Sequence, residues 1–348
     1  MSRQVLIGNI SVGGGAPVRI QSMTTVPVSD TEATLAQFDR LYEAGCEIVR
    51  VAVRDERDAR AIRSVKERSP MPVVADIHFS DRLAVLAVEN GADKIRINPG
   101  NIGGEERIKR VADCVRAHHI PVRVGANTGS IEKNFLGKYG RSAEALVESA
   151  LYNVSLLEKY GVEDIVISVK ASSVPLTVGA YRLLAKKTQY PLHVGVTEAG
   201  TRENGVVKSR VGIGTRRLDG MGDTIRVSLT DDPAEEIYAA KRILRACGLE
   251  KDFVEVISCP TCGRCEWNSM ELAGKVEKMT FGIKKPLKLA VMGCVVNGPG
   301  EAKDCDLGIA GGKDKCVLFS KGVPVKSVAA DRAEEEFLAE VRRLLEEE

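Results

Sequence analysis

The sequence predicts an α/β protein, a parallel (β/α)8 barrel of the TIM type followed by a small α+β domain. Short runs of β-branched residues recur through the first two-thirds of the chain, and amphipathic stretches with helix-capping residues separate them. This alternation changes after residue 248. Eight strand–helix units in roughly 250 residues fit a closed barrel better than an open sheet.

Eight segments have the Val- and Ile-rich composition of buried parallel strands. In chain order they are 18–23, 47–53, 72–79, 94–99, 121–128, 164–170, 191–198 and 223–229. The helix expected between the first two begins after Asp30, a capping residue, and ends at Gly45, which can adopt the left-handed conformation of a helix end. Residues 142–161 and 231–248 predict further helices of this outer layer.

An open, doubly wound sheet that binds a dinucleotide is the alternative fold. It would carry a G-x-G-x-x-G turn after its first strand. The glycines at 13–15 lack this spacing and indicate a plain turn. The barrel is therefore favoured.

The last hundred residues predict a separate α+β domain, so we expect domains at 1–248 and 249–348. Strand-like and helix-like segments follow one another there without the regular strand–helix repeat. They are 253–258, 268–279, 287–293, two short runs at Cys305 and Cys316, and a charged helix from about Asp331.

Composition limits the classes of function. With 50 Lys and Arg against 48 Asp and Glu, the formal net charge is +2, which argues against a nucleic-acid or membrane partner bound by bulk charge. No apolar run is long enough to cross a bilayer, and the N-terminus lacks a signal-peptide pattern, so we expect a cytoplasmic protein. Its nine cysteines are then thiols or metal ligands rather than disulfides.

Polar residues recur on one face of five predicted strands. Residues two or four apart share a face, as do Asp76 with His78, Arg96 with Asn98, Arg123 with Asn127, Ser168 with Lys170, and Arg226 with Ser228. In a single strand, an arginine that pairs with a helix carboxylate would be the simpler interpretation. Five strands with polar residues near their C-terminal ends favour one shared mouth, because TIM barrels place their active sites there.

The residue types at this mouth predict an anionic ligand. Converging guanidinium and ammonium groups on a chain of nearly zero net charge indicate a phosphate or diphosphate. The cations are Arg50, Arg96, Arg123, Lys170 and Arg226, and Asn98, Asn127 and Ser228 would orient the ligand. Asp76 and Glu198 are acids in the same ring, and His78 is a candidate proton relay.

The cysteine motifs "SCPTCGRC" (258–265) and "MGCVVNGPGEA" (292–302) belong to the second domain. A zinc knuckle would need a second cysteine pair, and a redox dithiol would need no distant cysteine. The third interpretation is an iron–sulfur cluster on Cys259, Cys262 and Cys294 that leaves one iron for a weaker ligand. Spacing alone leaves all three open and favours the cluster only slightly over zinc.

The combination of "CPTCGR", "MGCVVNGPGEA", "GDTIRVSLTDDP", "ADIHF" and "IRINPGNIG" resembles the 4-hydroxy-3-methylbut-2-en-1-yl diphosphate synthase family, the cluster enzymes of non-mevalonate isoprenoid synthesis. The resemblance covers nearly the whole chain. It implies a 4Fe–4S cluster held by Cys259, Cys262, Cys294 and the carboxylate of Glu301. It also implies a barrel that binds 2-C-methyl-D-erythritol 2,4-cyclodiphosphate through the mouth residues Arg50, Asp76, His78, Arg96, Asn98, Arg123, Asn127, Lys170, Glu198, Arg226 and Ser228.

The reaction that the resemblance implies is a two-electron reductive opening of the cyclic diphosphate with loss of water. Glu301 would give up its iron to a substrate oxygen, and Glu198 is our candidate proton donor. No flavin or nicotinamide motif is visible, so we expect electrons from a ferredoxin or flavodoxin. The alternative function is a zinc-stabilised barrel with a binding or regulatory role.

A homodimer with shared active sites is the expected assembly. The last barrel helix should run back to the bottom of the barrel, while the active site lies at the top. The short connection to the strand near Phe253 spans roughly 15–20 Å, which is too short to bring the cluster domain over its own barrel mouth. The resemblance also implies a head-to-tail dimer.

Two features depart from what we expect of the family. Cys265 adds a third cysteine at x-x spacing, which could compete as a ligand or be oxidised. Arg216 and Arg217 stand where we expect apolar residues, so the local packing needs explanation.

Overall fold

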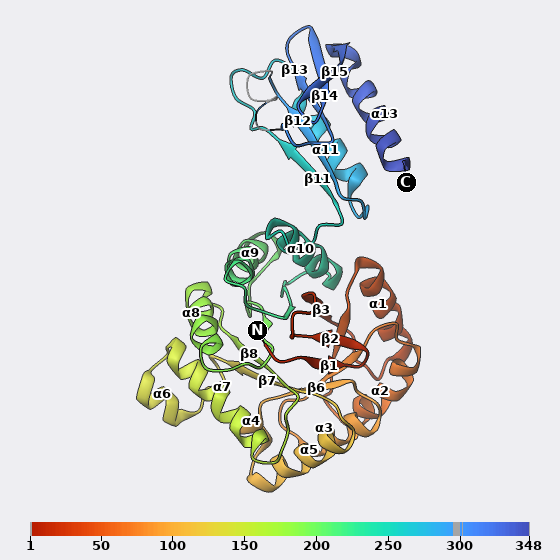
Figure 1. Ribbon diagram of the computed structural model, residues 1–348. Helices are drawn as coiled ribbons and strands as arrows, with labels where there is room; N and C mark the ends of the chain where they lie inside the picture. The colour runs from red at the N-terminus through yellow and green to blue at the C-terminus, as the bar shows by residue number, and fades with distance from the viewer. Residues whose placement is uncertain (1, 295–299, 301, 348) are drawn as a thin grey trace. The chain divides into compact units, whose positions relative to one another are not determined.

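The computed structural model describes residues 2–294, 300 and 302–347. The chain divides into two compact units, Met1–Leu249 and Glu250–Glu348 (Figure 1). Each unit has a hydrophobic core of its own. None of the described helices has the length and apolar character needed to traverse a bilayer.

Eight parallel strands form a ring in the first unit. They are β3 (Arg19–Met23), β4 (Ile48–Ala52), β5 (Val73–Asp76), β6 (Lys94–Ile97), β7 (Val122–Asn127), β8 (Ile165–Lys170), β9 (His193–Val194) and β10 (Thr224–Ile225). Their hydrogen-bonded order is β8-β7-β6-β5-β4-β3-β10-β9, and a parallel bridge from Ile167 to Leu192 links the two ends. The predicted (β/α)8 class is confirmed.

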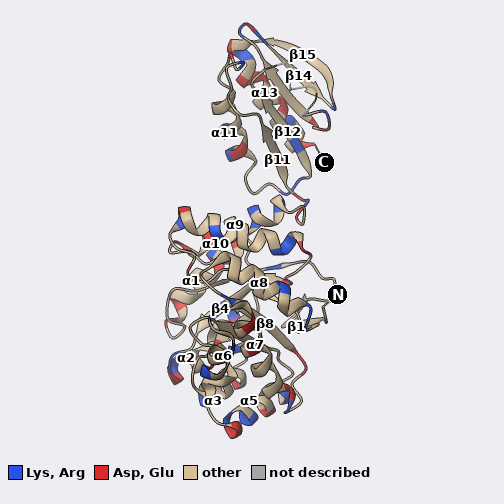
Figure 2. Ribbon diagram, turned by 90° about the vertical axis from the view of Figure 1, so that its left-hand side faces the viewer, with Lys and Arg blue, Asp and Glu red and all other residues tan. Residues whose placement is uncertain are grey.

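Helices surround this ring (Figure 1). They are α1 (Thr31–Ala44), α2 (Glu56–Arg68), α3 (Asp81–Glu89), α4 (Pro99–Ile102), α5 (Glu105–Ala117), α6 (Lys133–Tyr139), α7 (Ala143–Glu158), α8 (Val174–Ala185), α9 (Arg202–Leu218) and α10 (Pro233–Ala246). At α1 the predicted caps are present: the Asp30 side chain accepts from the Ala33 N–H, and Gly45 has φ 97°. Acidic and basic residues are interspersed along the outer helices (Figure 2).

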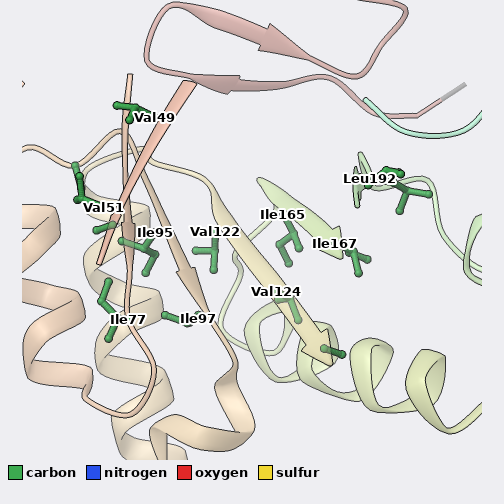
Figure 3. Packing of buried hydrophobic residues seen from close by; sticks show 14 of the residues in the cluster. Val49, Val51, Ile77, Ile95, Ile97, Val122, Val124, Ile165, Ile167 and Leu192 are labelled. Atoms are coloured by element: carbon green, nitrogen blue, oxygen red, sulfur yellow. The ribbon is translucent and has the colours of Figure 1, made fainter. Parts of the chain in front are cut away.

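The main core lies between the strands and the helices. Alternate strand residues such as Val49, Val51, Val122 and Val124 join it, together with apolar residues of the helices (Figure 3). Because strand side chains alternate between faces, the residues between these valines must point into the barrel. This alternation directs the charged residues of the strands inward.

A hairpin that the sequence analysis did not predict packs against the starting ends of the strands. Strands β1 (Val5–Ile7) and β2 (Ile10–Val12) pair antiparallel. Ile7 and Val12 form a small core with Ile48 of β4 and Val74 of β5, and all four side chains are fully buried. The lower end of the barrel interior is therefore apolar.

Strands β9 and β10 have only two residues each, so the predicted ranges 191–198 and 223–229 were too long. The predicted ranges include the loops that follow these strands. Val196 and Val227 lie in those loops and are buried, with exposures of 0% and 1%. The apolar residues of these loops continued the apolar pattern of the strands, so the sequence predicted strands longer than those observed.

Arg216, the first unexpected arginine of α9, is buried against an aromatic ring. Its side chain is fully enclosed, and the guanidinium carbon lies 4.7 Å from the centre of the Tyr181 ring. Arg217 instead donates to the backbone oxygens of Met221 and Gly222 at the end of the helix. Both arginines thus pack within the helical layer, away from the barrel interior.

The second unit is a five-stranded mixed sheet with helices. Its elements are β11 (Val254–Ser258), α11 (Ser269–Thr280), β12 (Leu287–Met292), β13 (Leu307–Gly311), β14 (Lys315–Ser320), β15 (Val323–Ala329), η1 (Ala330–Arg332) and α13 (Ala333–Glu346). The sheet order is β11-β12-β13-β14-β15, with β11, β12 and β13 parallel. The sequence analysis missed β15, most of whose residues are exposed, Val323 and Val325 among them.

Replacing Ile7 with alanine should destabilise the barrel by about 2–5 kcal/mol, because it opens a cavity in the core under the strands. Leu6→Ala is the matched control, since Leu6 lies on the same strand and is 57% exposed. Urea unfolding followed by far-UV circular dichroism would measure both changes. Equal stabilities of the two variants would show that the hairpin does not support the barrel.

Candidate active site at the barrel mouth and cysteine region of the second unit

The interior of the barrel carries several buried charges. In β4, Val49 and Val51 belong to the outer core, while Arg50 between them points inward and is 9% exposed. In the neighbouring strands, too, the residues between those of the outer core point into the barrel. The buried basic side chains are Arg50, Lys94, Arg96, Arg123 and Lys170, and the buried carboxylate at these positions is Asp76.

Asp76 is the centre of an ion cluster. Its Oδ1 accepts from Arg96 Nη1 at 3.2 Å, and Arg50 Nε lies 3.7 Å from Oδ2. His78 Nε2 also lies 3.7 Å from Oδ2, while its Nδ1 is 3.3 Å from Arg96 Nη1. The structure thus brings together four residues predicted for the site.

Electrostatics keep Asp76 ionised. Burial by itself would raise the pKa of this carboxyl, but Arg50, the hydrogen bond with His78, and Arg96 and Arg123 outweigh burial and hold the pKa well below its usual range. Burial lowers the pKa of Arg50 to about 10, against the attraction of Asp76. The single carboxylate is therefore shared among several cations.

Arg123 and Lys170 lack a comparable anionic partner among the described residues. Arg123 is 2% exposed, and neither its Nε nor its Nη1 makes a hydrogen bond in the described part of the chain. Burial, together with Arg50 and Arg96, lowers its pKa well below the usual value, and burial together with Arg123 does the same for Lys170. Since an arginine keeps its proton in proteins, Arg123 is suited to a bound anion.

Arg226 has a partner that strand alternation could not predict. Its Nε and Nη2 each lie 3.3 Å from an oxygen of Glu236, a buried residue of α10. Glu236 also accepts from Ser22 Oγ at 2.8 Å. This pair fixes the guanidinium of Arg226 near β3, where Met23 Sδ lies 3.8 Å from its Nη1.

Two glycines make room for the inward cations. A Cβ at Gly125 would lie 2.8 Å from Arg96 Nε, and a Cβ at Gly195 would lie 2.9 Å from Lys170 Nζ. At Gly195 a Cβ would also lie 2.5 Å from the backbone oxygen of Arg226, so a larger residue would meet backbone as well as the Lys170 side chain. The glycines therefore keep space for two long cationic side chains within the ring.

The remaining predicted residues lie where their strands end. Asn98 is 3% exposed, and its Oδ1 accepts from the Gly100 N–H at the start of α4. Asn127 and Ser228 are half-buried, and His78 and Glu198 are exposed. Glu198 has φ 51°, an uncommon left-handed conformation for a residue other than glycine.

Sequence reasoning missed three interior residues. Gln21, Lys94 and His193 are almost fully buried, and each has a side-chain nitrogen without a hydrogen-bond partner among the described residues. The signal for Lys94 was present, because it lies two residues before Arg96 on the same face of β6. These residues lie nearer the starting ends of their strands than the predicted mouth residues do.

A surface hollow of about 680 Å³ at the opposite end of the barrel does not share this chemistry. Its lining includes Arg3, Lys186, Gln189 and Asp223, at and before the starting ends of β9 and β10. These residues are not part of the buried ion cluster. The candidate site is therefore identified by its converging buried charges and not by the size of a surface cavity.

In the second unit, the ends of two adjacent parallel strands bring cysteines together. Cys259 follows β11, and its Sγ accepts from the Gly293 N–H at 2.9 Å, directly before Cys294 at the end of β12. Cys262 is exposed on the turn that follows, where its carbonyl accepts from the Cys265 N–H at 2.9 Å. All nine cysteines lie in the described part of the chain, and each is a free thiol.

Cys265 is engaged with protein groups. Its Sγ lies 3.2 Å from the carbonyl oxygen of Trp267 and 3.2 Å from Ser269 Oγ. The predicted ligand Glu301 lies outside the described residues. Within the described residues, no three His, Cys, Asp or Glu side chains come close enough together to hold a metal ion.

A closed TIM barrel with buried cations at its mouth, joined in one chain to an α+β domain with thiols at adjacent strand ends, defines a class of two-domain, anion-binding barrel proteins. Comparison with known proteins refines this class. The GcpE TIM-barrel domain matches residues 2–241, and the GcpE protein C-terminal domain matches residues 255–343. The chain belongs to the GcpE family.

Curated relatives match over the full length. A protein of Caldanaerobacter subterraneus subsp. tengcongensis is 55% identical over 349 residues, which cover 100% of this chain and 98% of that protein. One of Desulfotalea psychrophila is 53% identical over 350 residues, covering 99% and 96%. Both are named 4-hydroxy-3-methylbut-2-en-1-yl diphosphate synthase (flavodoxin), so the family predicted from the motifs is confirmed.

A solved structure supports the fold alone. The truncated 3-deoxy-D-arabino-heptulosonate 7-phosphate synthase of Thermotoga maritima superposes with a TM-score of 0.51 at 15% identity, covering 71% of this chain and 94% of that one. The likeness is one of barrel architecture.

Replacing Asp76 with asparagine should destabilise the barrel at neutral pH by about 3–5 kcal/mol, because it leaves buried cations without their carboxylate. The folded-state pKa of Asp76 is depressed, so its stabilisation is present above the unfolded-state value of about 3.9 and declines as pH falls below it. The difference in free energy of unfolding between wild type and Asp76→Asn should therefore become smaller at acidic pH. Urea unfolding at several pH values measures it.

The control is Asp113→Asn, which removes the same charge from a side chain that is 54% exposed. It should change stability by less than about 1 kcal/mol. A gap between wild type and Asp76→Asn that stayed constant from neutral to acidic pH would contradict the assignment of a depressed pKa to Asp76.

Proposed function

We propose that the barrel mouth binds 2-C-methyl-D-erythritol 2,4-cyclodiphosphate and that thiols of the second unit would hold a 4Fe–4S cluster able to supply the electrons for opening its ring. At the level of the overall reaction, the function is that of the family: an oxidoreductase that forms 4-hydroxy-3-methylbut-2-en-1-yl diphosphate. The predicted function and enzyme class are confirmed at that level. The residues, the cofactor and the assembly are our proposal.

The observation that carries the substrate site is the charge imbalance inside the barrel. Five buried basic side chains face one interior carboxylate, Asp76, and Arg123 has two guanidinium nitrogens without a partner among the described residues. A diphosphate supplies the missing negative charge and several oxygen acceptors. Arg50, Arg96, Arg123, Lys170 and Arg226 hold the diphosphate, and Asn98, Asn127 and Ser228 orient it.

Proton transfer falls to residues at the rim. Glu198 is exposed and held in a left-handed conformation, which supports a positioned functional side chain. Glu198 donates a proton to the departing oxygen. His78, which contacts both Asp76 and Arg96, relays protons, and Asp76 keeps the two arginines in place.

The thiols of the second unit fit an iron–sulfur cluster by their donor chemistry. Cys259 and Cys294 lie at the ends of adjacent strands, Cys262 is accessible, and thiolates are the ligands that such clusters require. We assign Cys259, Cys262 and Cys294 as ligands, with Glu301 as the fourth. When bound, the cluster supplies electrons one at a time and a Lewis-acidic iron.

Three further features complete the proposal. The names of the relatives specify flavodoxin, so we take flavodoxin as the electron donor and ferredoxin as the alternative. The enzyme works in the cytoplasm. We assign a homodimer in which each second unit covers the partner's barrel, as the resemblance to the family implies.

The ligand assignment is tested by three variants. Cys294→Ser should abolish the cluster, and Cys265→Ser should leave iron and sulfide content intact, because Cys265 contacts Trp267 and Ser269. Glu301→Ala should retain a cluster on three thiolates but lose nearly all activity. Iron, sulfide and visible absorption of anaerobically purified protein measure the first two results.

The same measurement separates the enzyme from a zinc-stabilised barrel. A colourless, folded wild-type protein with one bound zinc would overturn the cluster assignment. Loss of iron from Cys265→Ser would show that Cys265 belongs to the ligand set. Full activity of Glu301→Ala would remove Glu301 from the mechanism.

Mixed dimers test the shared active site. A chain with Arg123→Ala and Lys170→Ala lacks a working barrel, and a chain with Cys294→Ser lacks the cluster, so each should be inactive alone. Co-purified as a verified mixed dimer, they should regain partial activity, since one intact barrel faces one intact cluster. A mixed dimer without activity would mean that each chain uses its own cluster.

A further inference from the structure

Lys94 is an ammonium-bearing residue enclosed in the barrel without a counter-charge. It is the first residue of β6 and pairs in register with Val74 of β5. Its side chain is 0% exposed, and its Nζ makes no hydrogen bond within the described part of the chain. Ile95, the next residue, joins the outer core, so Lys94 points into the barrel.

The groups around Lys94 offer it no carboxylate. Beside it lies Val74 of β5, which packs with Ile48 on the N-terminal hairpin. Polar and charged residues face the interior from the eight strands and from the loop after β10: Gln21, Arg50, Asp76, Arg96, Arg123, Lys170, His193, Thr224 and Arg226. Asp76 is already engaged by Arg50, Arg96 and His78, and Glu236 by Arg226 and Ser22.

An ammonium in such surroundings is strongly unfavourable. Removing an unpaired charge from water costs several kcal/mol, and a buried lysine avoids this cost by losing its proton. Burial first, and then repulsion from Arg123 and Arg50, lowers the pKa of Lys94 well below its usual value. In the ligand-free barrel, Lys94 is therefore a neutral amine.

The reaction changes the charge that enters this interior. A cyclic diphosphate has one ionised oxygen on each phosphorus. Ring opening frees a further oxygen on the terminal phosphorus, so the linear product carries one more negative charge. If the number of positive charges in the barrel were fixed, it could not balance the negative charge of both the cyclic and the linear diphosphate.

We propose that Lys94 is a proton reserve for the barrel: a neutral amine when the site is empty, which takes a proton from solvent as diphosphate charge enters and grows at the mouth. The inference rests on the proposed diphosphate site. Lys94 does not touch the ligand. Its charge acts on the bound diphosphate together with the charges of the cations above it. Its protonation favours the linear diphosphate over the cyclic one.

Two other interior groups could take up this proton. His193 is 0% exposed, its Nδ1 lies 2.8 Å from Thr224 Oγ1, and its Nε2 has no partner among the described residues. An imidazole is intrinsically far less basic than an amine, so Lys94 gains its proton first. Burial and the neighbouring arginines lower the pKa of Lys170 as well, but Lys170 is 8% exposed and lies nearer the mouth, so we assign it to direct contact with the ligand. Proton uptake by Lys170 would persist in a Lys94 variant, which separates the two residues.

The test counts protons taken up on binding by calorimetry, in buffers that differ in ionisation enthalpy, with the cluster-loaded enzyme. The probes are the cyclic substrate and ethyl diphosphate, a linear alkyl diphosphate. At about pH 8.5 both are fully ionised, since the second phosphate pKa is roughly 6. Wild type should take up more protons with the linear ligand than with the cyclic one.

Lys94→Met should lose this difference and weaken linear-ligand binding by roughly tenfold, the effect of removing one charge interaction. Lys94→Gln should give the same result, and it serves as a second variant in case the methionine disturbs folding. His193→Gln is the matched control and should keep the difference.

Equal uptake in wild type and both Lys94 variants would overturn the inference, and so would loss of uptake in His193→Gln alone. If neither probe bound to the wild-type enzyme, that result would refute the diphosphate site itself, and the inference with it. Binding without Lys94-dependent uptake refutes the inference alone.

Discussion

The surplus of positive charge inside the barrel is the constraint on which the rest of the molecule depends. Arg50, Arg96 and Arg123 are enclosed with one interior carboxylate and repel one another, and burial has removed much of their hydration. Such an arrangement persists only inside a framework that is stable for other reasons. Here that framework is the Val- and Ile-rich layer between strands and helices, together with the apolar hairpin core at the starting ends of the strands.

The same constraint explains several local features that have no role in the hydrophobic core. Gly125 and Gly195 leave room for Arg96 and Lys170, and the soft sulfur of Met23 lies 3.1 Å and 2.9 Å from two nitrogens of Arg50. Asp76 lies 3.2 Å from Arg96 Nη1 and 3.7 Å from Arg50 Nε, and its charge holds both guanidinium groups beside it. In the function proposed above, these features arrange the interior before the anion binds, which would lower the cost of ordering the site on binding.

The cysteine region follows a different principle. Parallel pairing of β11 and β12 in register places Cys259 beside Gly293 and Cys294, although 34 residues separate Cys259 from Gly293. The neighbouring Cys305 and Cys316 are buried in the apolar cores of this unit, and burial raises the pKa of Cys305 to about 11. Position at the strand ends therefore separates the cysteines suited to ligation from those that serve packing.

The sequence by itself determined the barrel, the order of its strands and the inward direction of Arg50, Arg96, Arg123 and Lys170, because the two-residue period of a strand fixes which side chains share a face. Family motifs added the reaction. Tertiary structure decided what no local pattern contains: that Glu236 of a helix pairs with Arg226, that a hairpin packs under the strands, and that Lys94 is left without a partner among the described residues. Local patterns record the direction of a side chain, whereas its partners come from distant parts of the chain and exist only once the fold has formed.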